Sequence, residues 1–366
     1  MAVYTILFLI TAAAGIPMCG LSEKKDGRTL GIYCIVMAVL FTAVSSLRFG
    51  VGYDYNLYAG WFYGLNFTDF DELRGDRREI GIFLLLKLVN IFSADYAAAF
   101  PLISLLIYPP LMYYIFKNSD NPWISTAAFM GMGLFFNSMN FMKQFIAAVI
   151  CAFAFQYAAK GSYSRFFLIV LAASAFHRSA LFLLPCVLFV LIDWSFMTLG
   201  ITAALSAAAY AFSEPLVRWV TQYVYSMYDP DSSREMINGI SICYAVMFGV
   251  LFVAAFLLRN RMTGDKRSIN MIIWCCFGAF FFELIGSRYA IVSRMALLFF
   301  IPAVCLGIPK IFTALYSLSE KKKKGRGIAV IAAAVILLMG NCLFLMERNY
   351  NGVIPYRTIF EREDNA

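Results

Sequence analysis

The side chains best able to do chemistry lie in short groups between long apolar stretches. The set comprises four cations, two carboxylates, two tyrosines, two amides and the only histidine of the chain. In chain order the set is Arg48, Asp54, Tyr55, Tyr58, Glu79, Asn140, Lys143, Gln144, His177, Arg288 and Arg294. An arginine fork matches the oxygens of a phosphate or diphosphate, and a histidine or carboxylate can take a proton from a hydroxyl. These residue types suit transfer from a diphosphate donor to a hydroxyl, with cations stabilising the leaving diphosphate in place of a metal.

The stretches between these groups are too apolar for a soluble protein. Of the 366 residues, 61% are hydrophobic and 14% are charged, whereas a soluble domain carries about 25% charged residues. We therefore predict an all-α integral membrane protein, a single polytopic domain over residues 1–366 with about twelve transmembrane helices. The apolar runs are 3–18, 30–47, 97–116, 123–136, 141–159, 166–176, 180–192, 196–212, 240–258, 269–285, 295–315 and 328–346.

The basic residues predict which side of the membrane each loop faces. The loops 22–28, 117–121, 160–165, 259–267 and 310–326 hold 16 Lys and Arg in 44 residues, whereas the alternate segments hold 13 in 95. The denser set should be cytoplasmic, and 310–326 is the loop with the largest number of Lys and Arg. The N-terminus and the loops 48–79 and 214–238 then lie outside. This alternation requires the segment 80–93 to dip into the membrane and return.

All the candidate groups then fall on the outer side. Asn140, Lys143 and Gln144 are spaced i, i+3 and i+4, so a helix presents them on one face. Few ionisable residues lie deep in the apolar runs, which disfavours a proton-coupled transporter and favours chemistry at the outer leaflet. The net charge of +8 belongs to membrane topology, so nucleic acid is not an expected partner.

No metal or cofactor is expected from the sequence. The nine cysteines lie in apolar runs, and no two of them show the two-residue spacing of a zinc or redox site. A single histidine excludes a multi-histidine metal centre. An acidic cluster resembles a carboxylate metal site, but we interpret it as a solvated loop. Its members are Asp69, Asp71, Glu72 and Asp76.

Short motifs around the candidate residues resemble a known family. They are LRFGVGYDYNLY from Leu47, EIG from Glu79, KQFIA from Lys143, AFHRSA from Ala175, RMALLF from Arg294, and the late Pro355-Tyr356. In this order they resemble the EpsG-like family of Wzy-type exopolysaccharide and capsule polymerases, most closely over residues 45–190. One departure is Lys143, where the family commonly has arginine; lysine keeps the charge but loses bidentate geometry.

The resemblance implies a helical bundle similar to the Wzy and GT-C enzymes. Such a protein joins undecaprenyl-diphosphate-linked oligosaccharide repeats into exopolysaccharide, capsule or O-antigen at the outer face of the bacterial cytoplasmic membrane. Membrane lipid, a flippase and a chain-length regulator are the implied partners.

The expected mechanism is a single, inverting displacement without a metal. His177 acts as general base, assisted by Asp54 or Glu79. The residues expected to hold the diphosphate are Arg48, Lys143, Arg288 and Arg294, and those expected to bind the sugar or acceptor are Tyr55, Tyr58, Asn140 and Gln144.

Other interpretations remain open from the sequence. The chain could be an outer-leaflet glycan ligase, a transferase using a lipid-monophosphate sugar with a metal at Asp69 and Asp71, or a flippase of lipid-linked oligosaccharide. The candidate residues also have structural alternatives. Arg48 can be a helix-end charge that reaches the headgroups, and Asp54 can cap a turn or pair with Arg48. His177 can be an interfacial residue, and the tyrosines members of an aromatic belt.

Overall fold

The computed structural model describes residues 1–19, 27–65, 79–223, 240–320 and 325–362. Helices joined by short connections make up nearly all of this part of the chain. Its only strand-like pairing is an isolated bridge between Arg48 and Thr358. The predicted all-α class is confirmed.

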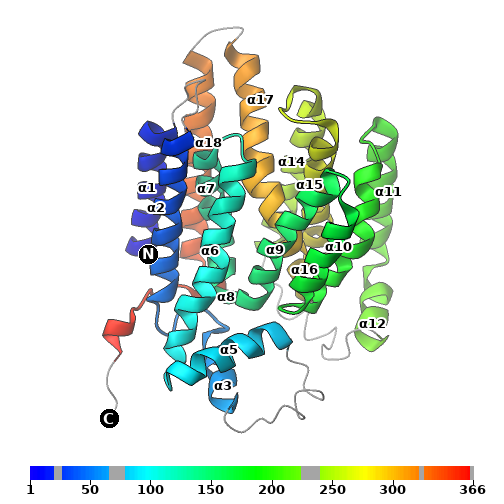
Figure 1. The fold of residues 1–366 in the computed structure, drawn as a ribbon. Coiled ribbons are helices and arrows are strands. Elements are labelled where there is room, and N and C mark those ends of the chain that lie inside the picture. The colour runs from blue at the N-terminus through cyan, green and yellow to red at the C-terminus, as the bar shows by residue number, and fades with distance from the viewer. Residues whose placement is uncertain (20–26, 66–78, 224–239, 321–324, 363–366) are drawn as a thin grey trace.

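The helices run up and down in one bundle, and short helices lie across its lower end (Figure 1). The α-helices are α1 (Ala2–Cys19), α2 (Gly27–Ser46), α3 (Tyr55–Gly64), α5 (Ile80–Phe92), α6 (Ala99–Asn118), α7 (Pro122–Gly131), α8 (Leu134–Asn140), α9 (Met142–Ala159), α10 (Tyr163–Ser174), α11 (Phe196–Ala211), α12 (Ser213–Tyr223), α14 (Ile240–Leu258), α15 (Lys266–Gly286), α16 (Ala290–Pro302), α17 (Ile308–Glu320) and α18 (Gly325–Glu347). The 3₁₀ helix η3 (Arg178–Leu191) follows α10, and the π-helical turn η5 (Ala303–Gly307) joins α16 to α17.

Six described helices are long and apolar enough to cross a membrane, so the chain is a multi-pass membrane protein. They are Gly27–Ser46, Tyr96–Asn118, Met142–Ala159, Ile240–Arg261, Lys266–Gly286 and Ala290–Leu318. A seventh arises if α11 and α12, bent by 71°, form one span, and α12 occupies the start of the predicted outer loop 214–238. The predicted total of about twelve is not confirmed, because five other apolar helices have only 10–17 residues.

One predicted span, 123–136, breaks in the middle. Gly133 has a left-handed φ of +72° and separates α7 from α8. A β-carbon there would lie 2.6 Å from both Leu345 and the Tyr244 hydroxyl. Glycine is therefore required by backbone conformation and by close packing, and the run yields two short helices.

The segment predicted to dip and return behaves differently. Ile80–Phe92 form one uninterrupted helix, α5, which is shorter than a span. It lies across the lower end of the bundle beside α3 (Figure 1). The prediction that it does not cross agrees with its length, but its residues do not turn back within the segment.

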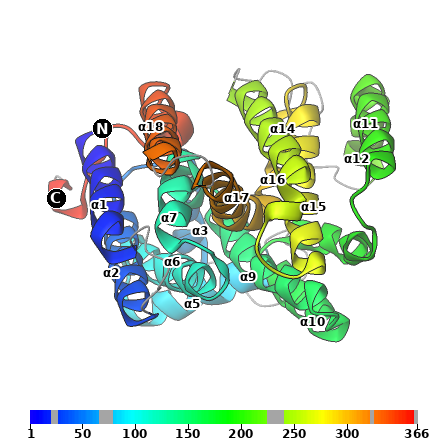
Figure 2. The same ribbon diagram turned by 90° about the horizontal axis from the view of Figure 1, so that it is seen from above.

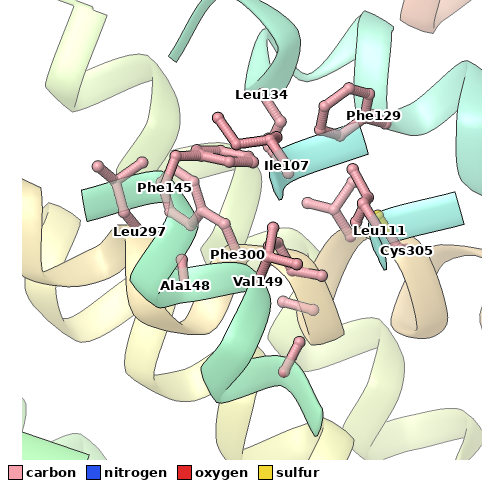
Figure 3. Packing of buried hydrophobic residues seen from close by; sticks show 14 of the residues in the cluster. Ile107, Leu111, Phe129, Leu134, Phe145, Ala148, Val149, Leu297, Phe300 and Cys305 are labelled. Atoms are coloured by element: carbon pink, nitrogen blue, oxygen red, sulfur yellow. The ribbon is translucent and has the colours of Figure 1, made fainter. Parts of the chain in front are cut away.

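The core centres on α9, which packs against α6 and α16. Viewed from above, α9 lies between α6 on one side and α15 and α16 on the other (Figure 2). Small residues on α9 such as Ala148 let these helices approach closely. Figure 3 shows the resulting apolar packing around Ile107, Leu111, Phe129, Leu134, Phe145, Val149, Leu297, Phe300 and Cys305.

The two ends of the bundle are chemically distinct. The connections α2–α3, α8–α9 and α15–α16 lie at the lower end, as do α3 and α5, whereas α6–α7, α9–α10 and α14–α15 meet at the upper end (Figure 1). Three of the loops predicted to be cytoplasmic, 117–121, 160–165 and 259–267, therefore lie opposite the candidate residues.

Candidate functional site

Five charged or titratable side chains from five different segments meet at the lower end. We call them the charged cluster: Asp54, Glu79, Lys143, His177 and Arg294. Asp54 and Glu79 precede α3 and α5, Lys143 is in the first turn of α9, His177 precedes η3, and Arg294 is near the start of α16. Because all five elements begin at this end, their N-termini also add partial positive charge there.

The pKa values of these side chains show that they influence one another. Burial raises the pKa of Asp54, and the charges of Arg294 and Lys143 act against that rise. Burial lowers the pKa of His177, and Lys143 and Arg294 add to that effect. Glu79 acts on His177 in the opposite sense. The sequence prediction that these five groups face a common region is therefore supported by their interactions in the structure.

Lys143 is already paired inside the cluster. Its Nζ lies 2.6 Å from Oε2 of Glu79, a carboxylate that is 5% exposed, and 4.9 Å from the centre of the Trp61 ring. An ammonium has further donors beyond the one this pair uses. Lys143 can still contact an anion, whereas Glu79 is engaged and is a poor candidate for a proton acceptor.

Asp54 has a different environment. Its backbone N–H donates to Oδ1 of Asn140 over 2.9 Å, and its side chain does not cap α3. Within the described residues, no hydrogen bond or ion pair engages its carboxylate. Burial raises its pKa, with Arg294 and then Lys143 opposing that shift. Asp54 is thus a carboxylate held in place through its backbone, with its oxygens available.

His177 is oriented by a neighbouring residue. Its Nδ1 accepts the Ser179 backbone N–H at 3.2 Å and lies 2.7 Å from the Ser179 hydroxyl. Accepting a hydrogen bond at Nδ1 leaves the proton of a neutral imidazole on Nε2. Burial, followed by the effect of Lys143 and Arg294, lowers the pKa of His177 to about 4. At neutral pH this side chain is a neutral donor through Nε2, which disfavours the predicted role as general base.

Arg294 is positioned by α9. The Gln144 side chain donates to the Arg294 carbonyl over 2.5 Å, and the guanidinium lies 5.1 Å from the centre of the Phe141 ring. Gln144 is 3% exposed. The amide predicted to bind sugar instead ties α16 to α9.

Asn140 also holds the site in place. Its Oδ1 accepts the Asp54 backbone N–H, and its Nδ2 donates to Oδ1 of Asn351 at 3.3 Å. Asn351 in turn donates to Oδ1 of Asn137 at 2.8 Å. This buried amide chain joins α8 to the C-terminal segment. Asn351 was not predicted; its left-handed φ of +65° before Gly352 is consistent with a turn, but its burial has no sequence signal.

The two tyrosines predicted to stack on sugar are interior. Tyr55 is 1% exposed and stacks on Phe100 with ring centres 4.3 Å apart. Tyr58 is 3% exposed, and its hydroxyl accepts the Lys143 backbone N–H at 3.0 Å. Both rings are covered by protein, because α3 folds back onto α6 and α9, so neither is open to a sugar here.

The other two predicted diphosphate ligands differ in position. Arg48 is fully buried next to the charged cluster, with its Nη2 2.9 Å from the sulfur of Met142, the residue before Lys143. Arg288 is exposed, and it packs 4.0 Å from the Tyr210 ring centre and donates to the Tyr210 carbonyl at 2.9 Å. Arg288 thus holds the turn between α11 and α12 and is not brought together with the other cations. Its predicted role as a diphosphate ligand stays a prediction.

The acidic residues of 69–76 lie outside the described residues. In the part of the chain that is described, no group of three or more His, Cys, Asp or Glu is arranged to hold a metal.

Comparison with known proteins gives one match. The model of the EpsG family matches residues 31–358, nearly the whole chain, and includes every residue of the charged cluster. No curated protein and no solved structure matches the chain.

Proposed function

The chain belongs to the EpsG family, which suggests an exopolysaccharide-related polymerase, and we propose that it joins undecaprenyl-diphosphate-linked repeat units at the outer face of the bacterial cytoplasmic membrane. The charged cluster carries this proposal. It combines two cations, one available carboxylate and one neutral imidazole donor at a single end of a membrane bundle. Those are the groups that displacement of a diphosphate by a hydroxyl requires.

In the proposed reaction the acceptor hydroxyl attacks the anomeric carbon of the donor sugar. Asp54 takes the hydroxyl proton as the new glycosidic bond forms. The bond from that carbon to the diphosphate breaks, and the lipid diphosphate leaves with the electron pair. Arg294 and Lys143 stabilise the developing charge, and Nε2–H of His177 donates to one of its oxygens. A single displacement inverts the anomeric centre.

This assignment differs from the sequence-based one in the base. A histidine whose pKa is about 4 and whose Nδ1 is occupied is a weak proton acceptor at neutral pH. The pKa of Asp54 is raised by burial, which makes this carboxylate a better proton acceptor than an exposed aspartate. The proposed sidedness rests on the basic loops 117–121, 160–165 and 259–267, which lie at the opposite end of the bundle.

Reconstitution tests the function directly. Purified protein receives synthetic polyprenyl-diphosphate-linked repeat units, with no second enzyme, in buffer with and without a chelator. We expect a ladder of products spaced by one repeat under both conditions, because the two cations supply the charge stabilisation. Transfer of a single unit that stops there indicates a ligase, activity that the chelator abolishes indicates a metal-dependent transferase, and movement of lipid across the bilayer without new glycosidic bonds indicates a flippase. Each of these three results overturns the proposal.

A further inference from the structure

Two apolar grooves run along opposite flanks of the bundle. The α2/α6 groove, of about 630 Å³, lies between α2 and α6 and is lined by Gly31, Ala38, Thr42, Leu105, Pro109 and Tyr113 among others. The α14/α15 groove, of about 730 Å³, is lined mainly by α14 and α15, with Tyr210 of α11. Figure 2 shows the two helix pairs on either side of α9. Both grooves have almost entirely apolar walls, as a hydrocarbon chain requires.

The lower end of the α2/α6 groove leads to polar atoms without partners. Thr42 lines the groove itself, and its Oγ1 is buried without a hydrogen bond. One helical turn further along α2, the Ser46 hydroxyl is also buried without a hydrogen bond, and so is Nε of Arg48. Since buried polar groups are nearly always satisfied, three such atoms at one helix end need an explanation.

The environment of Arg48 indicates that the missing partner is an anion. Its side chain is 0% exposed, yet the contacts of its guanidinium within the described residues are neutral. Nη1 donates to the Ser45 hydroxyl at 3.0 Å, Nη2 lies 2.9 Å from the Met142 sulfur, and the group is 5.0 Å from the Phe100 ring centre. A buried cation without a counter-charge is strongly unfavourable, and a bound phosphate would remove that penalty.

Arg48 lies close to the lower end of the α2/α6 groove. The Ser45 hydroxyl, which Arg48 contacts, accepts from Ser104 at 2.9 Å, so α2 and α6 are joined one residue beyond the groove residue Leu105. Thr42 of the groove, then Ser46 and Arg48, thus follow one another along the lower end of α2.

The α14/α15 groove lacks this feature. The cation next to its lower end, Arg288, already donates to the Tyr210 carbonyl and to the Ser213 hydroxyl. None of the residues that line the groove carries an unpartnered buried polar atom among the described residues. It therefore serves as a matched apolar surface with no demand for an anion.

We propose that the α2/α6 groove binds the polyprenyl chain of a lipid-diphosphate substrate and that the phosphate adjoining this chain is bound by Thr42, Ser46 and Arg48. This deepens the proposed function and rests on it, because that function supplies the lipid diphosphate. Because Arg48 is fully buried, the proposal requires residues 47–49 to separate from the C-terminal segment when the lipid binds. Two backbone hydrogen bonds hold them together, from the Phe49 N–H to the Arg357 carbonyl and from the Ile359 N–H to the Leu47 carbonyl.

The test uses a sugar-free polyprenyl diphosphate with a photoreactive diazirine on its chain. The full-length protein is placed in nanodiscs of phosphatidylcholine and phosphatidylglycerol, and the crosslinked residue of the unaltered protein is identified by mass spectrometry. We expect crosslinks to the α2 and α6 residues of the groove, resistant to added phosphatidylglycerol. Crosslinks confined to α14 and α15, or crosslinks that phosphatidylglycerol abolishes as for an ordinary annular lipid, overturn the proposal.

Matched substitutions sharpen it. Ala38→Trp fills the α2/α6 groove, and Ala254→Trp makes the same change at a half-buried alanine of the other groove. We expect at least about tenfold weaker probe binding for Ala38→Trp alone, equal to about 1.4 kcal/mol. Thr42→Val should weaken binding of the diphosphate but not of the uncharged polyprenol. Equal losses from both tryptophans, or a Thr42→Val loss shared by polyprenol, contradict the proposal.

The result also separates this inference from the proposed function. Crosslinks in the α2/α6 groove without any product ladder leave the groove assignment standing and remove the polymerase. A product ladder with crosslinks only in the α14/α15 groove does the reverse.

Discussion

The upper and lower ends of the bundle each contain a buried ion pair, and the two pairs are completed differently. At the upper end, Lys310 Nζ lies 3.0 Å from Oδ1 of Asp120 and 2.7 Å from the Thr263 carbonyl, and the Thr263 hydroxyl donates to the same aspartate. At the lower end, Lys143 and Glu79 pair over 2.6 Å, but Asp54, His177 and Arg294 add charge and hydrogen-bonding capacity around them.

We interpret the upper pair, Lys310 and Asp120, as structural and the lower charged cluster as the proposed reactive site. At the upper end the Asp120 carboxylate is engaged by both Lys310 and Thr263, so this pair fastens α17 to the α6–α7 and α14–α15 connections. At the lower end no described residue engages the Asp54 carboxylate, which leaves it available for the proposed reaction.

The largest expected effect is at Asp54. Asp54→Asn keeps the size of the side chain and removes the proton acceptor, so the rate of chain extension by purified protein should fall by about 10²- to 10⁴-fold. The upper-end change Asp120→Asn is the control and should leave the rate per folded molecule unchanged. Wild-type extension by Asp54→Asn would remove this carboxylate from the mechanism.

Arg294 should come next. Arg294→Gln removes a cation from the leaving diphosphate, and loss of one such stabilising group typically costs about 10²- to 10³-fold in rate. Arg294→Lys should be intermediate, because it restores the charge without the bidentate geometry. Initial rates at saturating substrate distinguish the three proteins, and equal rates for all of them would contradict the role.

His177→Ala gives a smaller effect if His177 is a donor and not a base. Loss of one hydrogen bond to a charged acceptor corresponds to about 1.5 to 3 kcal/mol, or roughly 10- to 150-fold in rate. The variant is assayed for chain length and extension rate after its membrane insertion has been verified. A loss of a thousandfold or more would return the base role to His177.

The smallest effect on rate is expected at the upper end. Lys310→Met leaves Asp120 without its partner, and breaking a buried pair in this way costs about 3 kcal/mol of stability. A thermal unfolding scan in detergent should show a lower midpoint while extension per folded molecule stays the same. A large loss of activity with unchanged thermal stability would show that the two ends are not functionally distinct.

The sequence predicted that the candidate residues gather at the lower end, because this grouping depends only on the order of apolar runs and loops along the chain. Alternating apolar runs and basic loops fix which connections lie together, and this places Asp54, Glu79, Lys143, His177 and Arg294 at one end. The break at Gly133 was missed, since a glycine inside an apolar run does not reveal a left-handed φ or the close approach of Leu345.

Side-chain roles were predicted less well than positions. Tyr55 and Tyr58 carry the expected motif but are buried, because the fold of α3 onto α6 and α9 depends on contacts far apart in sequence. Arg288 lies in the expected turn, yet its side chain points to Tyr210. Asn351 enters the site through a C-terminal segment that pairs with residues 47–53, a long-range contact that no local pattern encodes.

The pH dependence of chain extension tests most directly which group takes the proton. A carboxylate acts as base when ionised, so activity should fall as pH drops through the pKa of Asp54, which is raised above the usual aspartate range. His177, with a pKa of about 4, stays neutral throughout the physiological range. The account predicts that the acidic limb of the profile is the same in the wild-type protein and in His177→Asn. An acidic limb near pH 6.5 that disappears in His177→Asn would contradict it.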